Sequence, residues 1–489
     1  MSAEVLHGTG RRLRQLLGCV AALLIWGSVL AQAAAARPVA GVNAHLMWSG
    51  VSAAEQDRQL GLIADAGGRM ARVDVGWSSI EQDGKGQYER WHLDRLDALV
   101  DVAERHGVEL LLTVTDSPCW ASSAPAARKQ GCEGSWWSRD VQRYPPLDSR
   151  DYADVLAFLV RRYGDRVAAW EIWNEPNDAS YFKADDQAAA YARLVRAAYP
   201  AAKAADPSAT VIAGALAEAP AAFVERLLEH GIGGHFDAFS IHPYSGDASP
   251  YEPLDDEWVK NSFARGVPSV REVLLRHGED KPIWLTEFGW STSTIRGDEP
   301  WRNGVDERTQ ARSTELALAK VRDWPYVPVA IVFGLLDAGD DPVDRNSNFG
   351  LLRHDGSPKP AYAAFRRGAE ALADGVAVEQ AIEPDRVESS TRRLRLGIAR
   401  AGGRIYVRGG AAPRTVVRLR AHRYLRRKRR FARRAAYAVR VRVPRSGRFV
   451  RGLDGRLGRG RWRVTASYAR RPHAGGSRVR VTLRAGRPL

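Results

Sequence analysis

The chain has 489 residues, of which 45% are hydrophobic, so it can bury a large core, and its composition excludes general disorder. The formal charge of +16 is unevenly distributed. From Asp385 onward 33 Lys and Arg stand against 3 Asp and Glu, whereas the preceding part carries 40 against 54. The basic charge therefore belongs to the C-terminal region, and the larger part of the chain lacks the charge of a nucleic-acid-binding protein.

The N-terminus has the pattern of an export signal. Several arginines precede an apolar run, Leu16–Leu30, and small residues that suit cleavage follow it. The run is shorter than the about 20 residues that a membrane span needs. We therefore expect a signal peptide over residues 1–36 and a secreted or cell-wall-associated protein without a stable membrane span. A signal anchor or a lipoprotein site at Cys19 are the alternatives, and the twin arginine leaves the export route open.

Between residues 37 and 378, apolar β-branched runs alternate with amphipathic segments. The predicted strands are Val39–Leu46, Arg69–Trp77, Val108–Thr115, Val167–Asn174, Thr210–Leu216, Phe236–His242, Pro282–Phe288 and Val327–Leu336. The predicted helices are Ser52–Ala66, Leu93–His106, Asp148–Tyr163, Asp186–Ala205, Pro220–His230, one near Val270–His277, Glu307–Arg322 and Lys359–Ala373. Eight such units predict an α/β fold, a parallel (β/α)₈ TIM barrel. An open doubly wound sheet is the competing architecture, but no dinucleotide-binding fingerprint is present.

The connection 116–147 is long and rich in aromatic residues. It contains Cys119 and Cys132, the two cysteines that remain once the signal is removed. In an oxidising compartment such a pair favours a disulfide over two separate buried thiols. We expect an ordered, disulfide-closed segment over the mouth of the barrel, where barrel enzymes keep their sites.

Residues 385–489 change character. Segments that alternate polar and apolar residues predict a small antiparallel β-sandwich, with Tyr424–Arg434 as a basic connection. The predicted strands are Arg392–Ile398, Arg404–Arg408, Arg414–Arg420, Ala436–Val443, Trp462–Tyr468 and Arg478–Leu483. The arginines form either a solvated basic surface or a contact for an anionic polymer or cell wall. Nucleic acid is not expected as a partner of an exported protein.

Two glutamates stand where barrel strands open into loops. Glu175 ends the fourth strand in WEIWNEPN, and Glu287 ends the seventh in WLTEFGWS. Strands four and seven lie across the barrel mouth from each other, so the two carboxylates can face one substrate. Glycoside hydrolysis needs such a pair, one to protonate the leaving oxygen and one to support the anomeric centre. The alternative is that each glutamate only forms a structural ion pair.

These two segments resemble the active-site segments of glycoside hydrolase clan A, and they are most similar to families 39 and 5. The resemblance covers about residues 38–375. It implies a retaining β-glycosidase, with Glu175 as general acid/base and Glu287 as nucleophile. No cofactor and no metal are implied, and the substrate would be a polysaccharide or oligosaccharide. A catalytically silent polysaccharide-binding wall protein on the same scaffold is the alternative.

The resemblance also carries over four substrate-site residues. Asn174 matches the family's ligand for the sugar 2-hydroxyl, and Arg72 matches a strand-two arginine that holds the nucleophile ionised. His242 and Tyr244 match a His-x-Tyr on strand six, near the acid/base and the nucleophile respectively. Three of the four have a plainer alternative: a turn cap for Asn174, a core ion pair with Glu171 or Asp74 for Arg72, and a buried satisfied histidine for His242.

Further aromatic residues are candidates for sugar contacts. His45 and Trp48 end the first strand, and Trp290 follows Glu287. The sequence departs from the family on strand eight, where Phe333 stands in place of the tryptophan that many members place under the sugar. The identity of the sugar is therefore left open.

Overall fold

The computed structural model describes residues 37–254, 256–297 and 300–374, and eight further strands between residues 395 and 485. The predicted signal peptide, residues 1–36, lies outside the described residues. Among the helices of the described part, none is both long and apolar enough to cross a membrane.

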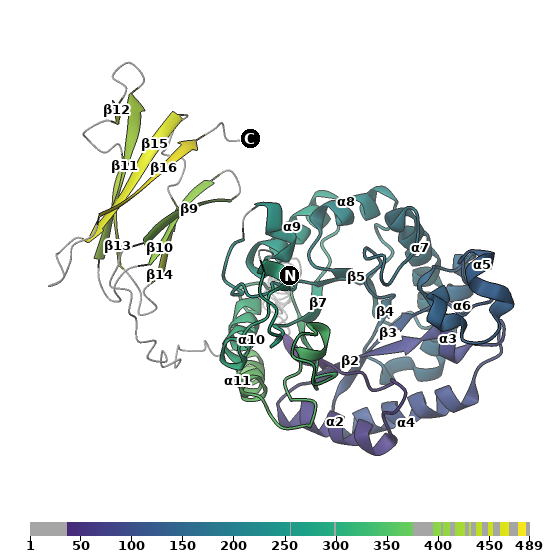
Figure 1. Ribbon diagram of the computed structural model, residues 1–489. Helices are drawn as coiled ribbons and strands as arrows, with labels where there is room; N and C mark the ends of the chain where they lie inside the picture. Colours follow the sequence, from purple (N-terminus) through teal and green to yellow (C-terminus); the bar gives the residue numbers. More distant parts are fainter. Residues whose placement is uncertain are drawn as a thin grey trace, which may run out of the picture.

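Eight parallel strands close into a barrel in sequence order, with the last strand paired to the first (Figure 1). The predicted TIM barrel is therefore confirmed. The strands are β1 (Val39–Asn43), β2 (Met70–Gly76), β3 (Glu109–Thr115), β4 (Ala169–Ile172), β5 (Val211–Ala217), β6 (Ala238–His242), β7 (Ile283–Phe288) and β8 (Val329–Phe333). Each overlaps a predicted strand; all but β5 are shorter than predicted, and β2 to β8 begin one or two residues later.

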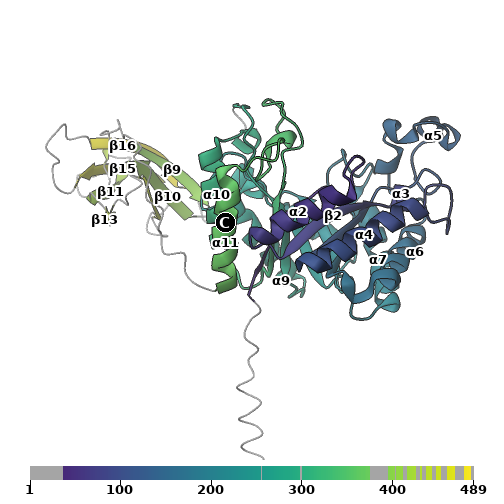
Figure 2. The same cartoon turned by 90° about the horizontal axis from the view of Figure 1, so that it is seen from below.

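A ring of helices surrounds the barrel (Figures 1 and 2). The long ones are α2 (Ala53–Asp65), α4 (Arg90–His106), α6 (Ser149–Tyr163), α7 (Gln187–Ala205), α8 (Ala221–Glu229), α9 (Phe263–Arg276), α10 (Glu307–Val321) and α11 (Pro360–Asp374). Helix α9 begins seven residues before the predicted start, because Pro268 lies inside the helix instead of marking its boundary. Ser52 caps α2 as expected, through a hydrogen bond to the backbone N–H of Glu55.

The hydrophobic core has two layers. A large cluster lies between the barrel and its helices, and a smaller one is drawn almost entirely from the barrel strands. The smaller cluster consists of Met70, Leu111, Ala169, Ile212, Ala238, Trp284, Val329 and Ile331. Most of these residues lie at or near the start of their strands, so they fill one end of the barrel with apolar side chains. Polar residues of the same strands are left to line the opposite end.

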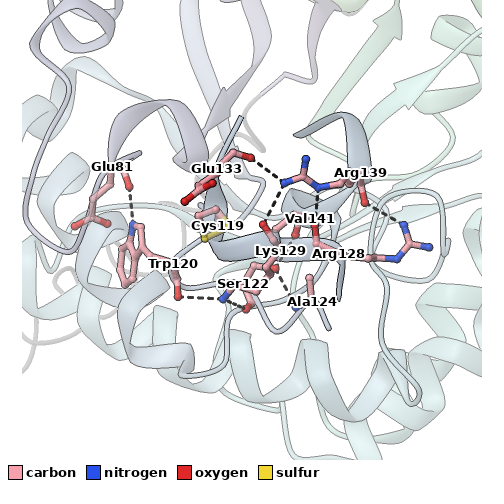
Figure 3. Close-up of a disulfide and its surroundings, with 11 residues drawn as sticks. Glu81, Cys119, Trp120, Ser122, Ala124, Arg128, Lys129, Glu133, Arg139 and Val141 are labelled. Carbon is pink, nitrogen blue, oxygen red and sulfur yellow. Dashed lines mark hydrogen bonds between the residues drawn. A yellow bond between two sulfur atoms is a disulfide. The ribbon is translucent and has the colours of Figure 1, made fainter. Parts of the chain in front are cut away.

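The connection 116–147 is ordered and includes α5 (Ala126–Lys129) and three short 3₁₀ turns, Gln130–Cys132, Trp136–Arg139 and Val141–Arg143. The predicted disulfide between Cys119 and Cys132 is present, with Cα atoms 5.7 Å apart (Figure 3). Arg139 binds the backbone carbonyls of Arg128, Lys129 and Glu133 at 2.6–3.1 Å. The disulfide and these hydrogen bonds hold the segment in one conformation.

The C-terminal region contains two antiparallel sheets, one in the order β14-β10-β9 and one in the order β12-β11-β15-β16, with β13 also paired to β11. Their strands are β9 (Arg395–Ala401), β10 (Arg404–Gly410), β11 (Val416–Leu425), β12 (Arg430–Phe431), β13 (Tyr437–Arg442), β14 (Arg448–Gly452), β15 (Gly460–Tyr468) and β16 (Arg478–Ala485). The predicted basic connection is instead partly a hairpin, since Tyr424 pairs with Phe431. The sandwich itself stays a prediction.

Candidate active site

The inward-facing polar side chains gather where the strands end. All eight strands are parallel, so their carboxyl ends share one side of the barrel, which is the side where barrel enzymes keep their sites. Arg72 from β2, Glu171 from β4, His242 from β6 and Glu287 from β7 are all buried there. Fully buried charged groups require partners, and each of these has one.

Glu287 is held by two donors. Nη1 of Arg72 lies 2.5 Å from its Oε1, and the hydroxyl of Tyr244 donates to its Oε2 at 2.6 Å. Both oxygens therefore accept charge-assisted hydrogen bonds, which suit the ionised carboxylate. Burial raises the pKa of Glu287 above its ordinary value, although His242, Arg72 and the Tyr244 hydroxyl act to lower it.

Arg72 is itself fixed by a second carboxylate. Its Nε donates to Oε2 of Glu171 at 2.7 Å, and the hydroxyls of Thr113 and Ser240 donate to Glu171 at 2.8 and 2.7 Å. Both charged side chains are completely buried. Burial lowers the pKa of Arg72 and the neighbouring carboxylates raise it, and the carboxylates prevail. The guanidinium thus stays charged and rigidly placed under Glu287.

Glu175 lies in a strained turn just after β4. It and Trp173 have positive φ angles of 46° and 65°, which are uncommon in residues other than glycine. The turn is held by backbone hydrogen bonds from Trp173 to Val114 and from Glu175 to Ala215 of β5, at 3.0 and 2.8 Å. Strain of this kind concentrates at functional sites, where surrounding structure enforces it. Here it turns the Glu175 carboxyl group toward His242.

His242 lies between the two glutamates. Its Nδ1 is 2.9 Å from Oε1 of Glu175 and 3.5 Å from Oε2 of Glu287, while Nε2 is 3.2 Å from the hydroxyl of Thr286. One ligand atom of each of the three residues lies within 4.8 Å of the others. A carboxylate and histidine cluster of this size could hold a cation, but Arg72 and Tyr244 already occupy both oxygens of Glu287.

The environments of the two carboxyl groups differ. Burial raises the pKa of Glu175 to about 8, and the negative charge of Asp178 adds to the shift. Glu175 therefore holds a proton at neutral pH, while Glu287 accepts hydrogen bonds at both oxygens. Burial and Asp178, rather than the charge of Glu287, are the main causes of the raised pKa of Glu175. Burial also lowers the pKa of His242, so its ring is neutral.

The other sequence-predicted residues take different positions. Asn174 accepts a hydrogen bond from Nη2 of Arg72 at 2.8 Å, which fixes its amide beside the two glutamates. His45 packs edge-on against Phe333 at 5.7 Å and so lies in the wall of the site. Trp290 does not join them. Its ring is 2% exposed, packs against Phe263 and Phe288, and donates to the carbonyl of Ala248.

Some residues near the two glutamates carried no sequence signal. Phe349 joins Phe333 and Tyr244 in an aromatic wall, with ring centroids 5.3–6.0 Å apart. The guanidinium of Arg345 stacks on Tyr244 and Phe349 at 5.7 and 4.9 Å. Asp178 follows β4, whereas Phe349 and Arg345 come from the loop after β8. Their positions follow from loop conformation, which no local periodicity encodes. Asp337, which follows β8, is paired with Lys359 at 2.8 Å.

Comparison with known proteins agrees with this geometry. The model of "Glycosyl hydrolases family 39" matches residues 59–379, about two thirds of the chain. A β-xylosidase of Caldicellulosiruptor saccharolyticus is 27% identical over 234 residues, which are 45% of this chain and 46% of that protein. The thermostable β-glucosidase B of Thermobispora bispora is 32% identical over 120 residues, 24% of this chain and 22% of that protein. The chain thus covers less than half the length of these relatives.

A solved structure supports the fold. A family 39 glycoside hydrolase from Bacteroides cellulosilyticus WH2 aligns with a TM-score of 0.52 and 21% identity, over 85% of this chain and 79% of that one. The likeness at this identity concerns architecture alone. The family match, by contrast, rests on sequence, and its span includes β2 to β8 with both glutamates. The chain therefore belongs to glycosyl hydrolase family 39.

Proposed function

We propose that the protein is a retaining β-glycosidase that hydrolyses O-glycosidic bonds by double displacement. The observation that carries the proposal is the approach of Glu175 and Glu287 to within 4.8 Å in unlike environments. Retaining enzymes hold their carboxyl groups about 5–5.5 Å apart, whereas inverting enzymes need about 6.5–9.5 Å to admit a water molecule between them. The distance here fits the retaining reaction.

In the first step, Glu287 attacks the anomeric carbon while Glu175 transfers its proton to the departing glycosidic oxygen. The bond from the anomeric carbon to that oxygen breaks, and a bond to Glu287 forms. Arg72 and Tyr244 hold Glu287 in the ionised state and in position for the attack. Asn174, fixed by Arg72, keeps its Nδ2 donors for a sugar hydroxyl.

In the second step, water takes the place of the leaving group. Glu175, now ionised, accepts a proton from the water, whose oxygen attacks the anomeric carbon and releases Glu287. The neutral ring of His242 bridges the two carboxyl groups and can donate to the ionised Glu175. The configuration at the anomeric carbon is retained after two inversions.

The substrate is proposed from the matched relatives, a β-xylosidase and a β-glucosidase. We infer a β-linked pentose or hexose at the cleaved bond, within an oligosaccharide or polysaccharide. The N-terminal signal pattern supports secretion, which would bring the enzyme to such polymers. The basic C-terminal region would then contact an anionic polymer or cell wall.

Aryl β-glycosides test the proposal. We expect Glu287→Gln to lose activity on every substrate, because no nucleophile remains. Glu175→Gln should lose far more activity on glycosides with a poor leaving group than on 4-nitrophenyl glycosides, which depart without a proton. Glu370→Gln, at an exposed position on α11, is the matched control and should behave as wild type.

The product stereochemistry must also be read, by NMR during early turnover. Release of the β-anomer supports the double displacement, and release of the α-anomer would contradict it. A protein that binds polysaccharide but cleaves no glycoside in any of the four forms would be the catalytically silent alternative.

A further inference from the structure

Trp48 is an exposed aromatic residue beside the active site that the proposed chemistry does not use. Its side chain follows β1 at the carboxyl end of the barrel, and 51% of its surface is exposed. One face of the indole is stacked on the ring of His45, with centroids 3.8 Å apart and planes 13° from parallel. The opposite face is therefore open to a ligand.

The loop that carries Trp48 is held rigidly. Nη2 of Arg95, from α4, lies 2.6, 2.7 and 3.3 Å from the backbone carbonyls of Trp48, Val51 and Leu46. Gln56 of α2 donates to the same Leu46 carbonyl at 2.9 Å. An exposed tryptophan is thus fixed in one place by two helices. A binding surface gains from such a fixed ring, because little conformational freedom is lost when a ligand stacks on it.

A continuous line of side chains connects this tryptophan with the nucleophile. His45 lies edge-on to Phe333, and Phe333 edge-on to Tyr244, whose hydroxyl donates to Glu287. A sugar stacked on the open face of Trp48 would consequently lie at the outer end of this line, further out than the sugar that Glu287 attacks.

Polar groups with unused hydrogen-bonding capacity lie beside the same ring. Nδ1 of His45 is 3.9 Å from Asp74, and Asp74 is 3.6 Å from Arg72, so neither contact of Asp74 is a hydrogen bond. Nδ1 of His45 and Oδ1 of Asp74 are buried without a hydrogen-bond partner, whereas the two side chains as a whole remain partly exposed, at 22% and 29%. Burial lowers the pKa of His45, so its ring is neutral and offers both a donor and an acceptor. The indole offers its open face to the apolar face of a pyranose, while His45 and Asp74, on the inner side of the indole, can bind hydroxyl groups where the substrate continues toward Glu287.

The position of Trp48 relative to Glu175 shows which end of the substrate would bind at Trp48. Glu175, the proposed acid, follows β4 and protonates the leaving group, so the leaving part extends toward the loops after β4 and β5. Trp48 follows β1, which lies on the other side of the closed barrel, between β2 and β8. Its ligand therefore belongs to the non-leaving end of the substrate.

We propose that Trp48, His45 and Asp74 form a second sugar-binding subsite on the non-leaving side, so that the enzyme recognises at least a disaccharide unit. The inference rests on the proposed glycosidase function and extends it from one sugar to two.

The test compares 4-nitrophenyl β-xyloside with 4-nitrophenyl β-xylobioside, and the glucoside with the cellobioside, with the released disaccharide identified as product. For at least one pair, wild type should have a higher kcat/KM for the disaccharide. Trp48→Ala should lower that preference about 10-fold, as expected for the loss of an aromatic contact. Trp91→Ala removes a comparably exposed tryptophan from α4, outside the barrel, and should leave the preference unchanged.

An unchanged preference in Trp48→Ala, or a wild type that gains nothing from the second sugar, overturns the subsite. If wild type cleaves none of these glycosides, the glycosidase proposal fails separately. Calorimetric titration of the Glu287→Gln protein with xylotriose and cellotriose, with and without Trp48→Ala, then decides the subsite. Binding of either sugar that is weakened by Trp48→Ala supports it, and binding that is equal or absent in both proteins refutes it.

Discussion

At the scale of single residues, the site places two chemically identical side chains in different environments. Both carboxyl groups are buried, but Glu287 accepts hydrogen bonds from a guanidinium and a hydroxyl, whereas Glu175 lies near the negative charge of Asp178. An environment that favours the proton on one carboxyl group and the charge on the other is how paired carboxylates divide acid and nucleophile roles.

The raised pKa of Glu175 predicts the pH dependence. Its protonated form is required for the first step, so kcat/KM should fall as the pH rises above about 8. Removing the negative charge in Asp178→Asn should lower this pKa, because the like charge that opposes ionisation is gone. The alkaline limb should then move to lower pH, by roughly half a unit.

The measurement is a pH profile of kcat/KM on a glycoside with a poor leaving group. Asp165→Asn, which removes a carboxylate just before β4 at the other end of the barrel, is the control. A limb that stays in place in Asp178→Asn, or moves to higher pH, would show that Asp178 does not act on the proton of Glu175.

At the scale of secondary structure, the catalytic turn depends on a neighbouring strand. The register of β5 against β6 shifts between Ala213 and Leu216, and Gly214 lies there with a φ of 122°. The next residue, Ala215, accepts the backbone hydrogen bond of Glu175 at 2.8 Å. The irregularity in β5 therefore positions the acid in the turn that follows β4.

Gly214→Ala should be strongly destabilising. A Cβ at this position would lie 2.2 Å from the carbonyl oxygen of Ser240, and the positive φ is itself unfavourable for alanine. We expect a loss of about 3 kcal/mol in the free energy of unfolding, together with a lower kcat. Gly278→Ala, with a φ of 79° but no atom within 4 Å of the added Cβ, should cost about 1 kcal/mol and leave kcat unchanged. Chemical denaturation of both variants checks this, and equal losses would contradict the steric argument.

Sequence periodicity predicts the order and type of these elements but not their irregularities. Alternating strands and helices were sufficient for the barrel because both faces of each strand are buried, which makes the apolar runs conspicuous. The positive φ angles of Trp173 and Glu175 and the shift in β5 have no comparable pattern, since contacts between different strands enforce them.

At the scale of the whole molecule, the barrel and the basic C-terminal region are proposed to have separate roles. If residues 385–489 serve attachment only, their deletion should leave hydrolysis of small aryl glycosides unchanged. The truncated protein should be released from an anionic polysaccharide matrix at lower salt than the full chain, because fewer arginines contact it. A salt-gradient elution compares the two proteins on carboxymethyl cellulose and on unmodified cellulose. If the full chain and the truncated protein elute at the same salt concentration on each matrix, the region has no adhesive role.

The sequence by itself determined the barrel, the disulfide pair and the position of the two glutamates, and the resemblance of their segments to a known family implied their near neighbours. Those features depend on local patterns and on motifs at strand ends, which remain readable in one dimension. Tertiary structure decided the rest. Trp290 looked suited to sugar contact but packs inside, while Trp48 remains outside on a loop fixed by α2 and α4. Exposure and charge pairing depend on which distant segments fold over a side chain, and local sequence does not encode that.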